Sequence, residues 1–252
     1  MQHAIERTTG GQHRPRLSVR LARSDKDIRR AQKLRYQVFA TEMGAQLASA
    51  AEGIDRDDYD AFCDHLLVED NLSGKVVGTY RMLPPHRARQ LPQLYSEHEF
   101  ELSRLAGIRD HVIEVGRSCV HKDYRRGAVI AMLWAGLADY VRQQGGQYLA
   151  GCASVSLADG GHQAVSLYRQ LEGKHLAPVE WRVTPHLALP LHQIQDDAAP
   201  APLPPLIKGY LRAGAWVCGE PAWDPDFNCA DFFMLLPMNR LDLRHQKHFA
   251  AS

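Results

Sequence analysis

The sequence lacks an apolar run long enough to cross a bilayer. A transmembrane helix needs about 18 or more consecutive apolar residues, whereas the longest run here, Ala128 to Ala138, stops at Asp139. The segment from Met1 to Leu17 is polar and has no apolar centre of the kind found in secretory signals. We therefore expect a protein that neither spans a membrane nor is secreted.

Cysteine is scarce, and its pattern is not that of a disulfide framework. The five cysteines are odd in number, scattered, and form no C-x-x-C pair. Histidine is more frequent, but His245-x-x-His248 is the only tight pair, and we expect no metal site from it. This usage predicts a reducing cytoplasm, in which the cysteines behave as small apolar residues.

A net charge of one sign is also missing. Thirty basic and 29 acidic residues leave a formal charge of +1, which argues against indiscriminate binding to polyanions. The charge is nevertheless segregated: ten Lys and Arg face three acids between Met1 and Tyr36, whereas eight acids face only Arg56 between Glu52 and Asp70. Such runs are usually solvated surface; the alternative is an acidic pocket beside a basic docking surface.

The 252 residues, 45% of them hydrophobic, suit one large globular domain or two small ones. Alternating or helical apolar spacing predicts strands at Leu17–Leu21, His65–Val68, Val76–Met82, Val112–Val120, Tyr148–Ala153, Val179–Val183 and Phe232–Pro237. The same criteria predict helices from Ser24 or Asp25 to about Val38, and at Phe100–Leu105, Gly127–Gln144, His162–Leu171 and Leu206–Ala213.

The order of these elements places antiparallel strands first and a βαβ crossover later. It predicts an α/β protein with a mixed central sheet flanked by helices. We expect a flexible basic arm at residues 1–16 and a domain over residues 17–252, with a C-terminal extension from about residue 185.

One constellation is suited to chemistry. Glu114-Val115-Gly116-Arg117 lies on a predicted strand, and Tyr124-Arg125-Arg126-Gly127 follows at the start of the long helix. A strand that enters a basic glycine-containing turn and a helix N-terminus offers free N–H groups to a phosphate. The plainer interpretation is an ordinary corner with exposed arginines.

These residues resemble those of acyltransferases with the Gcn5-related N-acetyltransferase (GNAT) fold. Four elements occur in the order found in acyl-homoserine-lactone synthases: Arg35-x-x-x-Phe39, Asp55-x-Asp57-x-Tyr59-Asp60, Gly78-Thr79-Tyr80-Arg81 and Glu114-x-x-Arg117. The pyrophosphate signature of acetyl-CoA enzymes is not matched at Tyr124–Ala128, which argues against free CoA as the donor.

The closer resemblance is to the ornithine-acyl carrier protein N-acyltransferases and covers about Leu17 to Phe249. It rests on Leu34–Phe39, Asp60-x-x-x-Asp64–Val68, Val77–Arg81, Glu114–Val120, Gly151–Ser154, Leu203–Arg212, Asp224–Asn228 and Asp231. It implies transfer of a (3R)-3-hydroxyacyl group from acyl carrier protein to the α-amine of L-ornithine. The product would be lyso-ornithine lipid. The acyl-4'-phosphopantetheine of the carrier protein would be a co-substrate, with no tightly bound cofactor.

The chemistry of the acceptor agrees with that implication. An α-amine with a pKa near 8 is about one tenth neutral at pH 7, whereas a side-chain amine near 10.4 is less than about a thousandth neutral. Glu114 is the candidate general base; alternatively it only pairs with Arg81 or Arg117. Tyr168 is a candidate acid for the leaving thiolate, although a tyrosine in this setting is more often packing.

The resemblance also implies binding residues. Arg35, Arg81 and Arg117 are candidates for the acceptor, the latter two for its carboxylate, and Asp57, Asp60 or Asp64 for its distal ammonium. The candidate donor residues are Ser118, Val120, Lys122, Arg125, Arg126 and Gly127. Acyl carrier protein is acidic, so Arg29, Arg30, Lys122, Arg125 and Arg126 are candidates for docking it. Cys119 and Cys152 are expected to pack in the core rather than to act as nucleophiles.

Other functions remain open at this point. Related enzymes acylate glycine, glutamine or lysine, or make acyl-homoserine lactones, although the added block Leu203–Arg212 argues against lactone synthesis. A membrane-active, haemolysin-like protein is the non-enzymatic alternative, and it predicts exposed apolar residues around Trp216, Trp223, Phe227 and Phe232. Peripheral contact with the inner face of the membrane is compatible with the enzyme too, because the first 36 residues are basic.

Overall fold

The computed structural model describes residues 16–194 and 201–241. The expected N-terminal arm, apart from Arg16, and the pair His245 and His248 lie outside the described residues. Two expected elements differ from the structure: the segment Phe100–Leu105 begins as a strand and is helical only from Ser103, where the 3₁₀ helix Ser103–His111 starts, and Val179–Val183 is not a strand. The other expected strands and helices are present, with shifts at their ends.

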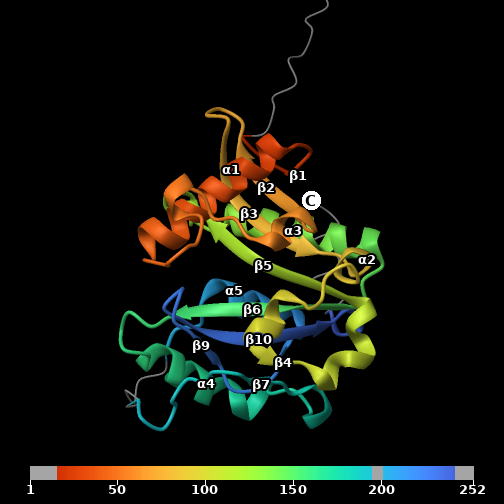
Figure 1. Ribbon diagram of the computed structural model, residues 1–252, viewed down its shortest axis with the longest axis vertical. Coiled ribbons are helices and arrows are strands. Elements are labelled where there is room, and N and C mark those ends of the chain that lie inside the picture. Colours follow the sequence, from red (N-terminus) through yellow and green to blue (C-terminus); the bar gives the residue numbers. More distant parts are fainter. Residues whose placement is uncertain (1–15, 195–200, 242–252) are drawn as a thin grey trace, which may run out of the picture.

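An eight-stranded mixed sheet forms the centre of the described part of the chain (Figure 1). Its strands run in the order β1 (Leu17–Leu21), β2 (Asp64–Asp70), β3 (Lys75–Leu83), β5 (Val112–Val120), β6 (Tyr148–Ser156), β10 (Cys229–Pro237) and β8 (Trp216–Val217), while β9 (Ala222–Asp224) also pairs with β10. Every pairing is antiparallel except that of β5 with β6. The expected mixed sheet is confirmed.

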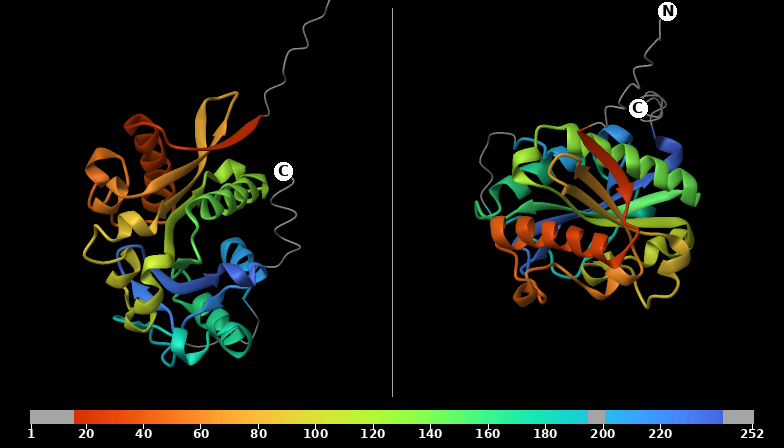
Figure 2. Two further views of the ribbon diagram at one scale, coloured as in Figure 1. Left: turned by 90° about the vertical axis from the view of Figure 1, so that its right-hand side faces the viewer. Right: turned by 90° about the horizontal axis from the view of Figure 1, so that it is seen from above.

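The helices lie on both faces of this sheet. They are α1 (Asp25–Tyr36), α2 (Pro85–Ala88), α3 (Ala128–Gln144), α4 (His162–His175) and α5 (Pro205–Ala213). On β2, Leu67 packs in the cluster that contains residues of α1, whereas its neighbours Leu66 and Val68 pack in the cluster that contains residues of α3. Because successive strand residues point to opposite faces, α1 and α3 cover opposite sides, as Figure 2 shows from above.

The two misassigned segments form other local structure for specific reasons. Phe100 pairs with Pro185 in a separate ladder between β4 (Phe100–Glu101) and β7 (Thr184–Pro185), and its ring packs on that of Phe233. Val179 follows Pro178 and is 63% exposed, in a 3₁₀ turn closed by the hydrogen bond from the N–H of Trp181 to the carbonyl of Pro178. Neither long-range pairing nor exposure is visible in a short apolar run.

The central parallel pair is short. Strands β5 and β6 each have nine residues but pair only from Val112–Tyr148 to Glu114–Ala150. On its other side, β5 pairs with β3 across a bulge, in which Arg117 has a φ of 51°. Beyond Glu114 the two strands therefore separate, and Figure 1 shows the sheet opening between them.

Gly151 is placed where β6 leaves β5, and it provides a test of this architecture. A Cβ atom there would overlap the carbonyl oxygen of Val115. We expect Gly151→Ala to lower the free energy of unfolding by about 1–3 kcal/mol, the usual cost of overpacking. Gly173→Ala is the matched control, because no heavy atom lies within 4 Å of the added Cβ in helix α4. Equal unfolding midpoints for the two variants in denaturant would contradict this account.

Candidate active site

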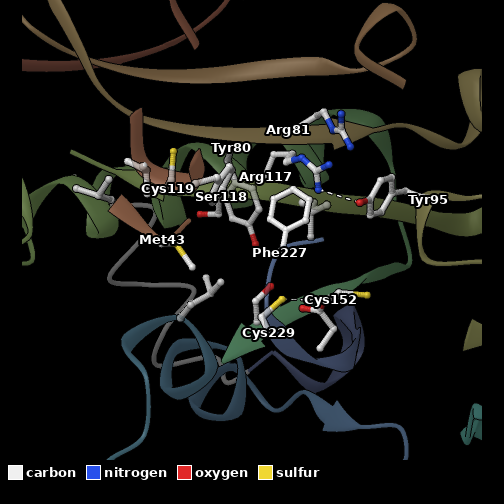
Figure 3. Close-up of a pocket in the computed structure, with 18 of the residues that line it drawn as sticks. Met43, Tyr80, Arg81, Tyr95, Arg117, Ser118, Cys119, Cys152, Phe227 and Cys229 are labelled. Atoms are coloured by element: carbon white, nitrogen blue, oxygen red, sulfur yellow. Dashed lines mark hydrogen bonds between the residues drawn. The ribbon is translucent and has the colours of Figure 1, made fainter. Parts of the chain in front are cut away.

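A cavity of about 480 Å³ lies between the separated strands. Its lining comes from β3, β5 and β6, the segment after α1, the loop before β2, the segment around Tyr95–Glu99, the β5–α3 turn with the start of α3, the start of α5, and the β9–β10 turn. In Figure 3, Arg81, Arg117 and Tyr95 lie on one side of this space, and Cys152 and Cys229 lie on the other. The cavity is therefore formed by segments that are distant in sequence.

Glu114 lines the cavity at the last residue of the β5–β6 pairing. It is 5% exposed, and its two carboxylate oxygens accept hydrogen bonds of 2.8 Å from the backbone N–H groups of Tyr95 and Ser96. Burial raises the pKa of Glu114, although these hydrogen bonds oppose the shift. None of the described basic side chains forms an ion pair with it, so the expected alternative of a direct pair with Arg81 or Arg117 is not formed.

Three arginines and three aspartates form a largely buried network of ion pairs. Its members are Arg35, Arg81, Arg117, Asp55, Asp57 and Asp60. Arg35 bridges Asp55 and Asp60 at 2.8 Å, and Arg81 bridges Asp57 at 2.5 Å and Asp60 at 3.0 Å. The arginines hold the pKa of Asp57 and that of Asp60 below their usual range against the effect of burial. The formal charges of the six residues cancel.

Arg117 is a member of this network that lines the cavity. Its guanidinium bonds Asp55 at 3.1 Å and the hydroxyl of Tyr95 at 3.0 Å. It also lies 4.8 Å from the ring centre of Tyr95 and 4.5 Å from that of Phe227, distances at which cation–π attraction operates. Figure 3 shows Arg117 beside these two rings. Arg117 therefore combines a positive φ with a side chain that is fixed by an aspartate, a hydroxyl group and two aromatic rings.

The acceptor residues expected from the sequence separate into two groups. Arg81 and Arg117 line the cavity, but Arg35, Asp57, Asp60 and Asp64 are not among its lining residues. Asp64 instead contacts Arg87 at 3.0 Å and the hydroxyl of Tyr140 at 2.7 Å. The acidic box from Asp55 to Asp60 mainly neutralises arginines. A cationic group in the cavity would therefore have to meet other carboxylates.

The donor residues expected from the sequence lie along the turn from β5 to α3. Ser118, Val120, Arg125 and Gly127 line the cavity, whereas Lys122 and Arg126 are exposed outside it. Arg125 bonds Glu42 at 2.6 Å and the carbonyl of Val120 at 3.0 Å.

Of the basic residues on α1, Arg29 is exposed. Arg30 forms ion pairs with Asp27 at 3.2 Å and with Glu69 at 2.5 Å, which partly neutralise its charge. Of the expected docking residues, Lys122, Arg125 and Arg126 are therefore exposed together at the turn before α3.

Tyr168 and the cysteines differ in their relation to the cavity. Tyr168 is buried in the core with Leu167 and Leu171 on α4 and is not among the lining residues. Its proposed role as an acid stays a prediction. Cys119 and Cys152 do line the cavity, but burial raises the pKa of Cys119 to about 12 and that of Cys152 well above its usual range. Protonated thiols are poor nucleophiles, which agrees with the expected packing role.

Sequence reasoning missed a second group of lining residues. Glu99, Asp224 and Asp231 present carboxylates to the cavity, and Tyr95 and Phe227 add rings. Asp224, Phe227 and Asp231 belong to the segments that carry the family resemblance. That resemblance is the sequence signal that could have pointed to them. Glu99 lies in the polar run Ser-Glu-His-Glu and has no distinguishing pattern.

Comparison with known proteins identifies the family. Residues 34–135 match the acetyltransferase (GNAT) domain family. The chain is 36% identical to the L-ornithine N(alpha)-acyltransferase of Brucella abortus (strain 2308), over 93% of this chain and 89% of that protein. It is 37% identical to the enzyme of the same name from Rhizobium meliloti (strain 1021), over 93% of this chain and 84% of that protein. The chain belongs to the L-ornithine N(alpha)-acyltransferase family.

The fold is also that of solved structures of lower identity. The crystal structure of TofI in a ternary complex with an inhibitor and MTA superposes with a TM-score of 0.51 at 18% identity, covering 89% of this chain and 92% of that one. At this identity the likeness concerns the fold alone. Together, the family and the domain match confirm an acyltransferase with the expected GNAT fold.

The membrane-active alternative expects exposed aromatic residues in this acyltransferase. Among the described residues, no helix combines the length and apolar character needed to cross a bilayer. Of the aromatic residues that this alternative expects on the surface, Phe232 is fully buried and Phe227 lines the cavity. Trp223 is the exposed residue of this group, with an exposed fraction of 40%.

Arg35 is fully buried, so its role in this acyltransferase can be tested by stability. Removing it would leave Asp55 and Asp60 short of a partner. Because uncompensated buried charges are costly, we expect Arg35→Ala to lower the free energy of unfolding by about 3–5 kcal/mol in guanidinium titrations. Arg29→Ala, on the exposed side of the same helix, should change it by less than about 0.5 kcal/mol. A stable Arg35→Ala enzyme with a raised KM for the acceptor would instead support direct substrate binding.

Proposed function

We propose that this acyltransferase transfers a (3R)-3-hydroxyacyl group from acyl carrier protein to the α-amine of L-ornithine. The product is lyso-ornithine lipid, and the reaction is the first step of ornithine lipid synthesis. Ornithine is supported by the names of the relatives that match nearly the whole chain. The observation that carries the reaction is Glu114, a carboxylate of raised pKa fixed in a cavity between separated strands.

The chemical step is aminolysis of a thioester. The neutral α-amine attacks the thioester carbonyl carbon, a C–N bond forms, and the C–S bond breaks with release of the pantetheine thiolate. Glu114 receives the proton that the attacking nitrogen loses, directly or through water. A raised pKa suits this role, because a base works best when its pKa is near the working pH.

The donor side of the cavity supports a carrier-bound acyl group. In the proposal, the acyl-4'-phosphopantetheine is a co-substrate, and its arm enters beside Ser118, Val120 and Gly127, which line the cavity at the β5–α3 turn. Lys122 and Arg126 are exposed at the same turn, outside the cavity. Such basic groups would attract an acidic carrier protein and orient it toward the opening.

We assign the reaction to the cytoplasm, with peripheral contact at the inner face of the membrane. The five cysteines are free and four of them are buried, as suits a reducing compartment. The product is itself a lipid. The basic N-terminal segment would add attraction to anionic headgroups.

Glu114→Gln tests the proposed base. We expect kcat to fall by about 10²- to 10⁴-fold with the KM for ornithine much less affected. In the wild type, Glu114 must be deprotonated, so activity should rise with pH through its raised pKa, and this limb should disappear in the variant. Rates with purified acyl carrier protein as the donor, measured between pH 5 and 9, provide the comparison.

Glu97→Gln is the matched control for Glu114. Glu97 accepts the N–H of Leu94 and pairs with Arg109, so it supports the same segment without lining the cavity. Equal losses of kcat in the two variants would mean that Glu114 acts only by holding that segment. Wild-type activity in Glu114→Gln would exclude the base mechanism.

The docking surface is tested by reversing its charge. We expect the double variant Lys122→Glu with Arg126→Glu to raise the KM for the acylated carrier protein roughly tenfold at low salt, which is ~1.4 kcal/mol. The difference from wild type should shrink as salt rises, because exposed charges are screened. Lys174→Glu, an exposed position on α4, is the control. An unchanged KM, or a change in KM that does not depend on salt concentration, would mean that the carrier protein docks at another surface.

A further inference from the structure

The cavity has a second cluster of acidic groups, opposite the arginine network. Glu99 follows the segment that holds Glu114, Asp224 ends β9, and Asp231 lies on β10. None of the described Lys, Arg or His side chains forms an ion pair with these three carboxylates. Acids that line a cavity without a cation differ from the Asp55–Asp60 box, in which the charges are compensated.

Two oxygens of this cluster have no hydrogen-bond donor as long as both acids are ionised. Oδ1 of Asp231, a residue that is 3% exposed, and Oε2 of Glu99 are buried atoms without a hydrogen-bond partner among the described residues. Buried acceptors of this kind are rare, since each costs the free energy of its lost hydration. Both residues line the cavity, so the missing donors lie at its wall.

The electrostatics define what kind of ligand fits. Burial and the carboxylates of Asp231 and Asp224 raise the pKa of Glu99 to about 9. Burial likewise raises the pKa of Asp231. Two such carboxyls favour a shared proton over two negative charges. A group that brings both positive charge and N–H donors satisfies the same oxygens and lets both carboxylates ionise.

This cluster is continuous with the proposed reaction centre. Ser96 donates its backbone N–H to Glu114, and its hydroxyl oxygen lies 3.6 Å from the sulfur of Cys152. Cys152 in turn adjoins Glu99. In Figure 3, Cys152 and Cys229 lie together on the side of the cavity that faces Arg117 and Phe227. Glu114 and the second acidic cluster therefore both lie near Cys152 in one cavity.

We propose that Glu99 and Asp231, supported by Asp224, bind the distal ammonium group of the acceptor amino acid and so select a cationic side chain. The inference rests on the proposed function, because it takes an amino acid as the acceptor. It moves the cation site from the Asp57–Asp64 region, where the carboxylates already serve arginines, to the opposite wall of the cavity. With its side-chain ammonium held there, ornithine presents its α-amine toward Glu114.

An ammonium fits this cluster better than a metal ion does. Asp224, Cys229 and Asp231 offer ligand atoms within 4.8 Å of one another. Burial and the two neighbouring carboxylates, however, raise the pKa of the Cys229 thiol far above its usual range, and its sulfur lies 3.3 Å from Oδ2 of Asp231 as a hydrogen-bond donor. A metal needs the deprotonated thiolate, whereas an ammonium needs only carboxylate oxygens.

The test compares two acceptors that differ only in the distal ammonium. L-ornithine and L-norvaline have the same carbon chain, and norvaline ends in a methyl group. We expect Glu99→Gln and Asp231→Asn each to lower kcat/KM for ornithine by at least about tenfold and to leave that for norvaline within about threefold. Two separate variants keep the test informative if one of them folds poorly.

Asp226→Asn is the matched control. Asp226 is an exposed carboxylate on the same turn as Asp224, and it does not line the cavity. We expect it to keep the wild-type preference for ornithine over norvaline. A loss of preference equal to that in Asp231→Asn would mean that overall charge, not a binding site, selects the acceptor, and would overturn the proposal.

The remaining outcomes separate this inference from the proposed function. If the wild type acylates ornithine and both site variants keep its preference over norvaline, the inference fails and the proposed function stands. If the wild type does not acylate ornithine, the proposed function itself fails. Loss of ornithine acylation on dialysis against EDTA, restored by added zinc, would assign the cluster to a metal and overturn the inference.

Discussion

The separation of β5 from β6 is the constraint on which the site depends. The two strands are paired over only three residues of nine, and the last pair contains Glu114. A strand residue at the end of a ladder keeps a fixed backbone while its neighbours leave room for a ligand. The β3–β5 bulge with Arg117 at positive φ, and the absence of a side chain at Gly151, accommodate this departure on the two sides.

The ion network supplies a rigid wall to the resulting cavity. Arg35, Arg81 and Arg117 connect α1, β3 and β5 through aspartates of one loop, and their charges cancel within a buried volume. Buried ion pairs contribute little net stability but are costly to break. Their role here is positional: Arg117 stays between two rings, and the segment beside it holds Glu114. The uncompensated acids lie on the facing wall, so the cavity has one neutralised side and one acidic side.

Much of this could be predicted from the sequence, and the failures are local. Helix α3 and strands β1, β2, β3, β5 and β6 follow from apolar spacing and from clear breakers such as Gly145. Glu114 and Arg117 were found through the spacing of a known family motif. Phe100 was assigned wrongly because its strand partner, Pro185, comes much later in the chain. The segment that begins at Val179 was assigned wrongly because it forms an exposed 3₁₀ turn after Pro178.

The sequence by itself determined the fold class, the order of the elements, the acyltransferase family and the position of the candidate base. Local periodicity and motif spacing carry that information, since both depend on residues that are near one another in the chain. Only the tertiary structure decided which acids are neutralised and which are not. Asp60 and Asp231 are both buried acids, but one lies against two arginines while the other has an oxygen without a donor. Charge compensation depends on distances between side chains from different elements, and a linear sequence does not contain them.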